Sequence, residues 1–291
     1  MLFLNRKEID IEKFYGGELT AIVGIPNDTL HYTITWLWDD KYGANELFII
    51  QALMETLYNK GITASLHMPY VPYARNDIED DVVDTIDKTP RYRVDTLSAL
   101  IKTINSMNFK EVIIAEPHSA VTSRGIDRCS NRHVSKLLIR KCLEDNGMKM
   151  DSVLFVLPDA GATKRYLHQL KLEENGLNWI SATKQRNSFG GGLQTYGFTG
   201  NVDNFDNVDV AIIIDDICGR GGTFIPLAET LREKGVENIN LVVTHCENNV
   251  HTGDVLKGNP IKKVYTTDSI LTVPHENLVI AHSFKPQSNG G

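Results

Sequence analysis

The sequence lacks the marks of several common protein classes. Its 291 residues include only four cysteines, and no two of them have the short spacing of zinc sites or redox motifs. No apolar run is long enough to span a bilayer, and charged residues at positions 6–8 exclude a signal-peptide core. The Gly-x4-Gly-Lys-Ser/Thr motif of P-loop proteins does not occur. A formal net charge of -7 disfavours broad binding to nucleic acid or to anionic membranes.

These absences favour a cytoplasmic protein with reduced thiols that has neither nucleic acid nor membrane as a partner. The length exceeds that of a usual single domain and predicts two domains of about 140 residues each. We place them at residues 1–130 and 131–291. Charged residues at 23% and hydrophobic residues at 42% are ordinary for a globular protein.

Strand-like and helix-like patterns alternate along the chain, which predicts an α/β fold with largely parallel sheets. A Gly- and Asn-rich stretch at 188–207 predicts a hairpin or loop. In the first domain, strands are expected at 19–25, 30–38, 62–68 and 111–116, and helices at 44–59 and 95–106. In the second, strands are expected at 152–157, 178–182, 210–214 and 239–244, and a helix at 133–146.

The most informative stretch is residues 210–231. An apolar run ends in Asp215 and Asp216, and a Gly-rich segment then leads into a helical pattern. A buried strand followed by Gly-rich backbone at a helix start offers unpaired amides to a phosphate, whereas the two acids suit ribose hydroxyls or a metal. The pattern predicts a site for a phosphorylated sugar. The alternative is that the two acids only end the strand and the glycines only turn the chain. The phosphate loop comprises Gly219, Arg220, Gly221, Gly222 and Thr223.

Three further strand ends carry polar residues, and in a parallel sheet such ends converge on one crevice. The first delivers Arg75, Asn76 and Asp77, of which the guanidinium suits a phosphate and the amide a nucleobase edge. The second places His118 after a buried strand. The third is the segment 159–161, an acid followed by small residues that let backbone amides approach a diphosphate. Taken singly, each has a structural explanation, such as a local hydrogen bond or a surface ion pair.

Read in order along the chain, these motifs resemble those of known enzyme families. Residues 210–231 resemble the ribose-phosphate motif of type I phosphoribosyltransferases. Nearly the whole chain resembles the ribose-phosphate diphosphokinases, also called phosphoribosyl pyrophosphate synthetases. The matching segments are Phe14-Tyr15-Gly16-Gly17-Glu18 for Phe-x-Asp-Gly-Glu, Tyr73-Ala74-Arg75-Asn76-Asp77 for Tyr-Ala-Arg-Gln-Asp, Glu116-Pro117-His118 for Asp-Leu-His, Pro158-Asp159-Ala160-Gly161 for Pro-Asp-x-Gly, and Lys184-Gln185-Arg186 for Lys-x-Arg.

The resemblance implies two type I phosphoribosyltransferase-like domains and a Mg²⁺-dependent enzyme. It implies transfer of the β,γ-diphosphoryl group of ATP to the anomeric hydroxyl of a 5-phosphorylated ribose, with release of AMP, and a homo-oligomer, dimer or hexamer. The implied roles are catalysis by Lys184, Arg186 and His118; ATP binding by Phe14, Glu18, Arg75, Asn76, Asp77 and His118; Mg²⁺ binding by His118 and Asp159; diphosphate binding by Asp159, Ala160 and Gly161; and binding of the ribose and its 5-phosphate by Asp215, Asp216 and residues 219–223.

Some residues differ from the family pattern, and these differences bear on which substrates the protein binds. The family loop reads Asp-Asp-x-x-Asp-Thr-x-Gly-Thr, whereas Gly219 and Arg220 replace its Asp-Thr pair here. We therefore expect a roomier, more positive 5-phosphate end that slightly favours ADP-ribose over ribose 5-phosphate as the acceptor. Gly16 and Asn76 also depart from the pattern and predict altered contacts with the base of ATP.

Two other classes compete with this interpretation. A phosphoribosyltransferase would consume the diphosphate sugar, but the ATP-like segments argue against it. A catalytically silent regulatory homologue is disfavoured because Lys184, Arg186 and His118 are all present. Residues 78–89 and 188–207 are the candidate loops for closing over the site.

Overall fold

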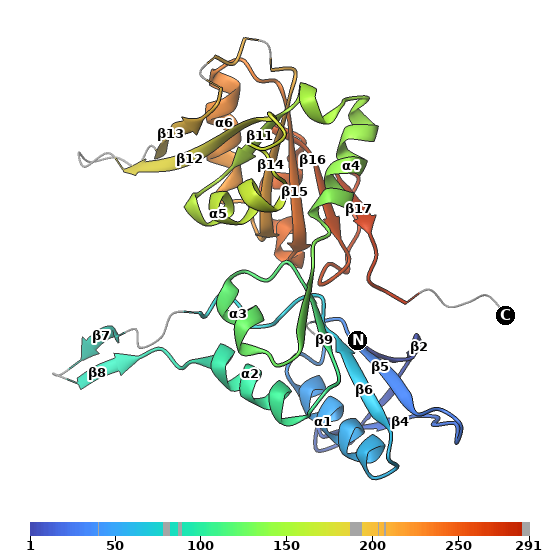
Figure 1. Cartoon of the computed structure of the whole chain (residues 1–291). Coiled ribbons are helices and arrows are strands. Elements are labelled where there is room, and N and C mark those ends of the chain that lie inside the picture. The colour runs from blue at the N-terminus through green and yellow to red at the C-terminus, as the bar shows by residue number, and fades with distance from the viewer. Residues whose placement is uncertain are drawn as a thin grey trace. The chain divides into compact units, whose positions relative to one another are not determined.

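The computed structural model describes residues 1–39, 41–77, 82–86, 89–186, 194–202, 204–206 and 208–286. The chain divides into two compact units (Figure 1). Unit 1 contains Met1–His133 together with the chain from Phe284 onward, and unit 2 is Val134–Ser283. The sequence-based division instead assigned every residue after 130 to the second domain, including 284–286. Among the described residues, no helix has the length and apolar character needed to cross a membrane.

Unit 1 is built on a six-stranded sheet in the order β10-β9-β6-β5-β1-β2. The four neighbouring strands β10, β9, β6 and β5 run parallel to one another. The strand β1 pairs antiparallel with both β5 and β2. Two small hairpins, β3–β4 and β7–β8, accompany the sheet, and β7–β8 projects away from it (Figure 1). The elements are β1 (Leu2–Leu4), β2 (Lys7–Glu8), β3 (Asp10–Lys13), β4 (Leu19–Ile22), β5 (His31–Trp36), α1 (Asn45–Tyr58), β6 (Thr63–His67), β7 (Val82–Ile86), β8 (Thr89–Tyr92), α2 (Thr96–Ser106), β9 (Val112–Ala115), α3 (Ala120–Gly125) and β10 (Cys129–Arg132).

Alternation along β5 shows how the sequence forms this unit. Tyr32, Ile34 and Trp36 are buried in the core, because successive side chains of a strand point to opposite faces. The helix α2 begins at an N-cap, Asp95, whose side chain accepts a hydrogen bond from the Ser98 amide at 2.8 Å. Such a cap fixes where the chain turns from the strand region into the helix.

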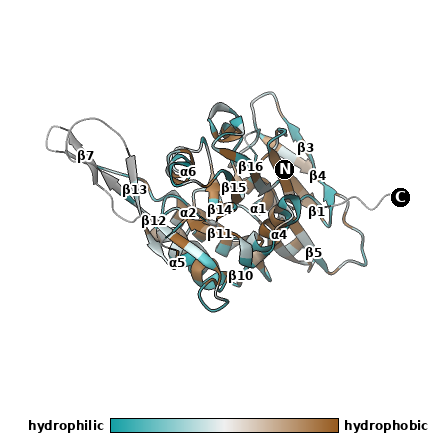
Figure 2. Cartoon of the chain, turned by 90° about the horizontal axis from the view of Figure 1, so that it is seen from above, coloured by the Kyte–Doolittle hydropathy of each residue, from teal (hydrophilic) through white to brown (hydrophobic). Residues whose placement is uncertain are grey.

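Unit 2 contains a seven-stranded sheet in the order β13-β12-β11-β14-β15-β16-β17, in which only β13 runs antiparallel to its neighbour. Its central strands are apolar and buried on both faces, as expected for a parallel sheet covered by helices (Figure 2). The elements are α4 (Ser135–Asn146), η1 (Met150–Ser152), β11 (Leu154–Leu157), α5 (Ala160–Gln169), β12 (Asn178–Arg186), β13 (Gln194–Gly200), β14 (Val210–Cys218), α6 (Phe224–Glu233), β15 (Asn238–Cys246), η2 (Asn248–Thr252), η3 (Val255–Lys257), β16 (Ile261–Thr267) and β17 (Leu278–His282).

The expected α/β architecture is confirmed, but several strand ends differ from their predictions: β4 ends at residue 22 rather than 25, and β12 continues to residue 186 rather than 182. The end of β14 matters most for the site. The sequence placed the end of the strand at residue 214, but β14 continues to Cys218, because Asp215 still pairs with Val243 and Cys218 with Cys246 in β15. The acid pair therefore lies within a strand rather than after it. In the stretch 188–207, the described residues of β13 form the expected hairpin with β12. Residues 78–81, 87–88, 188–193, 203 and 207 of the two candidate closing loops lie outside the described residues.

Candidate active site

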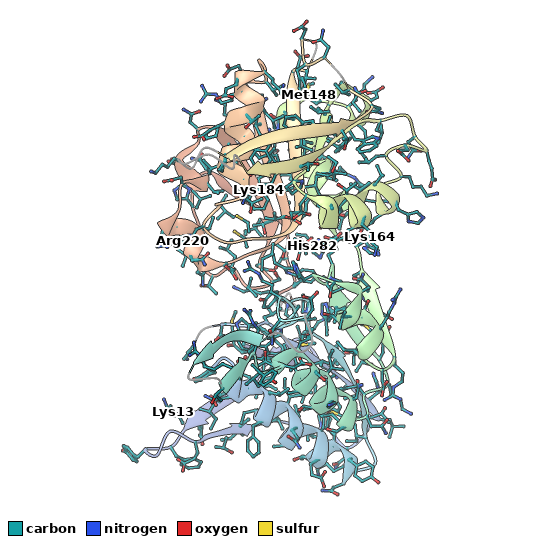
Figure 3. The ribbon with its side chains drawn as sticks, turned by 90° about the vertical axis from the view of Figure 1, so that its left-hand side faces the viewer. Lys13, Met148, Lys164, Lys184, Arg220 and His282 are labelled. Carbon is teal, nitrogen blue, oxygen red and sulfur yellow. The ribbon has the colours of Figure 1, made fainter. Side chains whose placement is uncertain are left out.

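Candidate site residues of unit 2 gather at one edge of its sheet. Asp159 follows β11, Lys184 lies near the end of β12, and Asp215 lies near the end of β14. The strand β11 pairs in parallel with both β12 and β14, so the three carboxyl ends are neighbours. Lys184 is exposed on the β12 ribbon, opposite Tyr196 of β13 (Figure 3). Arg186 is the last residue of β12, and its side chain lies outside the described part of the chain.

The two acids of β14 have different surroundings. The Asp216 side chain is only 4% exposed and accepts a 2.7 Å hydrogen bond from Nη1 of Arg165, a residue of α5. The same nitrogen lies 3.5 Å from Oδ1 of Asp215, which also accepts the Asp216 amide at 2.9 Å. Arg165 is itself largely buried, with 18% of its side chain exposed. Because a buried carboxylate needs a partner, Arg165 is the counter-ion that lets Asp216 remain charged inside the sheet.

The two acids also differ in their charge interactions. Burial and, next, the neighbouring Asp216 raise the pKa of Asp215 well above its ordinary value. Burial opposes the charge of Arg165, but Asp216 and Asp215 outweigh burial and raise the pKa of that guanidinium. Asp216 is therefore committed to an ion pair, while Asp215 is the more accessible carboxylate and holds a proton more readily. The sequence had suggested the same role for both.

The loop between β14 and α6 has the form of an anion-binding turn. Gly221 has a φ of +90°, and a Cβ on it would lie 1.8 Å from Cγ2 of Val255, so only glycine fits. Its carbonyl accepts the amides of Phe224 and Ile225 and starts the helix. Gly222 and Thr223 are exposed, and their amides donate to no acceptor within the described residues. Unpaired amides at a helix N-terminus are suited to a phosphate.

The start of the loop is crowded. A Cβ placed on Gly219 would lie 2.6 Å from Oε2 of Glu247 and 3.2 Å from Oδ1 of Asn249. The expectation that Gly219 leaves extra room is therefore wrong, because side chains from the segment after β15 fill that space. The loop also gains a carboxylate there, which offsets the charge added by Arg220. Arg220 is exposed, and its Nε donates to Thr252 Oγ1 at 3.0 Å (Figure 3).

Asp159 is the N-cap of α5. Its Oδ1 accepts the Ala162 amide at 2.8 Å, and the small residues Ala160 and Gly161 form the first turn. The hydroxyl groups of Thr163 and Ser181 lie 2.6 Å apart and tie α5 to β12. The cap thus fixes an exposed carboxylate at the same sheet edge as Lys184 and Asp215.

Unit 1 brings two of its own predicted segments together. The strand β6 leads to the turn with Arg75 and Asp77, and its neighbour β9 leads to His118; His67 pairs with Ile113 in the register. Arg75 is exposed, whereas Asp77 and His118 are half-buried.

Asn76 already uses its amide donors within the unit. Its Nδ2 donates to the carbonyl of Val94 at 2.8 Å and to Thr96 Oγ1 at 3.0 Å, which braces the start of α2. A role at a nucleobase edge would therefore fall to its Oδ1 or require these bonds to break.

Phe14 and Glu18 lie in the turn that joins β3 and β4. The Phe14 amide donates to the Glu18 carbonyl, and the Gly17 amide donates to the Phe14 carbonyl, both at 2.9 Å. The Phe14 ring is 58% exposed and offers a face for stacking.

Donor chemistry limits which residues would hold Mg²⁺. His118 belongs to unit 1 and Asp159 to unit 2. In the described part of the chain, no three His, Cys, Asp or Glu side chains gather as metal ligands. Mg²⁺ prefers oxygen and keeps water and phosphate ligands, so the carboxylates of Asp159 and Asp215 fit it directly, whereas His118 fits only through a water.

Comparison with known proteins gives no matching family model. The chain is 23% identical over 284 residues to the ribose-phosphate pyrophosphokinase of Ureaplasma parvum, covering 96% of this chain and 81% of that protein. It is 25% identical over 242 residues to the protein of the same name from Pyrococcus abyssi, covering 83% and 77%.

Among solved structures, the phosphoribosylpyrophosphate synthetase of Mycobacterium smegmatis superposes with a TM-score of 0.72 at 15% identity, over 96% of this chain and 87% of that one. The fold is thus that of two type I phosphoribosyltransferase-like domains, each with a mostly parallel sheet flanked by helices. The chain is thus similar over most of its length to proteins named ribose-phosphate pyrophosphokinase, and it shares the fold of the solved synthetase.

Proposed function

We propose that the protein transfers the β,γ-diphosphoryl group of ATP to the anomeric hydroxyl of ribose 5-phosphate and releases AMP. The observation that carries the proposal is the meeting of Asp159, Lys184, Asp215 and the loop 219–223 at one edge of the unit 2 sheet. The similarity to proteins named ribose-phosphate pyrophosphokinase supports it.

On the acceptor side, the 5-phosphate is bound by the positive end of α6 and by the Gly222 and Thr223 amides, which have no acceptor in the part of the chain that the structure describes. Asp215 accepts hydrogen bonds from the ribose hydroxyls in its ionised form. Arg165 keeps Asp216 neutralised, so that the bound sugar meets one net negative charge rather than two.

On the donor side, the reaction depends on charge neutralisation more than on a strong nucleophile. Lys184 and Arg186 stabilise the oxygens of the group in transfer, Lys184 as a point charge and Arg186 as a planar fork. Bound Mg²⁺ would neutralise the phosphate oxygens further. We assign ATP binding to the exposed Phe14 ring, Glu18, Arg75, Asn76, Asp77 and His118. The small residues Ala160 and Gly161 are assigned to the diphosphate, which their backbone amides can approach closely.

ADP-ribose is the second candidate acceptor. The charge of Arg220, held by Thr252 next to the loop, favours an acceptor whose 5-end continues into a diphosphate. The side chains that crowd Gly219 leave no extra room for the larger ADP-ribose, so ribose 5-phosphate is the preferred acceptor. We also propose a cytoplasmic homo-oligomer, a dimer or hexamer, on the basis of the family resemblance.

The test is AMP formation from ATP and Mg²⁺ by the purified protein, with ribose 5-phosphate and ADP-ribose in parallel reactions. Mass analysis of the sugar product identifies the acceptor. AMP with ribose 5-phosphate supports the proposal, and AMP with ADP-ribose alone reverses the acceptor assignment. No AMP with either acceptor would favour the silent regulatory homologue.

A further inference from the structure

We infer that Glu247 is a specificity-determining residue, which supplies from the end of β15 the carboxylate that the phosphate loop lacks at Gly219. The inference rests on the proposed function, because it concerns the loop assigned to the acceptor phosphate. Its basis is geometric: the Glu247 carboxylate lies where a side chain on residue 219 would be, with Oε2 only 2.6 Å from the ideal Cβ position. A side chain at 219 would therefore displace the end of the Glu247 side chain, and an acid there would bring a second carboxylate beside it.

Strand pairing places Glu247 there. Cys218 and Cys246 are register partners in β14 and β15, and the Glu247 amide donates to the Cys218 carbonyl at 2.8 Å. The residues that follow each cysteine, Gly219 and Glu247, are thus held side by side. Asn249 donates from Nδ2 to Glu247 Oε2 at 3.0 Å and fixes the carboxylate against the loop.

Steric room explains the glycine at 219, and backbone conformation does not. Gly219 is outside the left-handed φ region, whereas Gly221 lies in it at +90°. An aspartate at 219 would meet no backbone strain there, and the nearest atoms to its Cβ would be those of the Glu247 and Asn249 side chains. We therefore expect that a carboxylate at either residue 219 or residue 247 can occupy this place in the loop.

This arrangement has a consequence for the acceptor. A carboxylate fixed at the first residue of the loop repels negative charge that extends past a single 5-phosphate. Arg220 lies next in the chain, and its guanidinium is held toward Thr252 of η2. Glu247 therefore favours an acceptor with one 5-phosphate over an acceptor whose 5-end continues as a diphosphate.

The test exchanges the acid between the two positions. Gly219→Asp, Glu247→Ala and the double variant Gly219→Asp/Glu247→Ala are compared with the wild type for kcat/KM on ribose 5-phosphate and on ADP-ribose. We expect Gly219→Asp to lower kcat/KM on ribose 5-phosphate by about tenfold or more, because two carboxylates then meet at the start of the loop, and the double variant to recover most of that loss. Glu247→Ala should also lower the ratio of ribose 5-phosphate to ADP-ribose activity. Glu229→Ala, which removes an exposed acid from α6, is the matched control and should change neither value.

Urea unfolding of the same variants tests the geometry without any enzymatic reaction. Gly219→Asp should lower the unfolding midpoint in the wild-type background and leave it unchanged when Glu247 is alanine. If the wild type releases no AMP, the proposed function fails, while this stability cycle still decides whether Glu247 occupies the 219 position. A double variant no more active and no more stable than Gly219→Asp alone would overturn the inference.

Discussion

Replacing Arg165 tests how the acid pair is held in β14. The change Arg165→Met keeps much of the side-chain length and removes the cation that lies 2.7 Å from Asp216. Arg165 is 18% and Asp216 4% exposed, so the pair is buried, and removing one partner of such a pair costs about 3–5 kcal/mol. For a domain of this size that loss lowers Tm by about 6–20 °C. Thermal and urea unfolding followed by circular dichroism measure it.

Two further variants make the prediction specific. In Arg165→Met/Asp216→Leu the remaining buried charge is also replaced, so this variant should be more stable than Arg165→Met alone. Lys141→Met removes the exposed ion pair with Asp145 on α4 and should change stability by about 1 kcal/mol or less. The reasoning is refuted if Arg165→Met behaves like Lys141→Met, or if the double variant is the least stable of the three.

Three other variants separate charge, specificity and catalysis. Lys184→Ala should lower turnover by orders of magnitude with unchanged unfolding, because Lys184 is exposed; near-normal turnover in the steady-state AMP assay would remove it from the mechanism. Arg220→Thr should shift preference toward ribose 5-phosphate, measured as the ratio of kcat/KM values, and an equal loss on both acceptors would defeat that role. Because the pKa of Asp215 is raised in the folded protein, folding is favoured when this carboxyl is protonated. The wild type therefore loses stability as pH rises from the ordinary aspartate pKa to the raised pKa of the folded state, by about 1.4 kcal/mol for each pH unit between these two pKa values. Asp215→Asn should therefore gain stability relative to the wild type as pH rises above the ordinary aspartate range in urea titrations, and parallel curves would contradict the assigned burial.

The sequence predicted well those features that depend on local pattern. The apolar runs before Asp159 and Asp215 form neighbouring strands, and the glycine-rich segment after β14 forms the turn into α6. In each case, burial on both faces requires a continuous apolar run, which is visible in the residues themselves.

The features that were missed depend on contacts between distant segments. Arg165 lies on a helical face whose partner, Asp216, is on another strand, and no spacing signals that pair. Glu247 meets Gly219 only because β14 and β15 pair in one particular register. The extension of β14 through the acids was also missed, since acids normally disfavour a buried strand unless a cation such as Arg165 compensates them.

The central claim, transfer of an intact diphosphoryl group, is tested most directly by identifying both products of the wild-type enzyme with ATP, Mg²⁺ and ribose 5-phosphate. Nucleotide chromatography and ³¹P NMR are run on the same reaction. We expect AMP in equal amount to a ribose 5-phosphate that carries two coupled phosphorus atoms on its anomeric oxygen. ADP with a singly phosphorylated sugar, or no consumption of ATP, would contradict it.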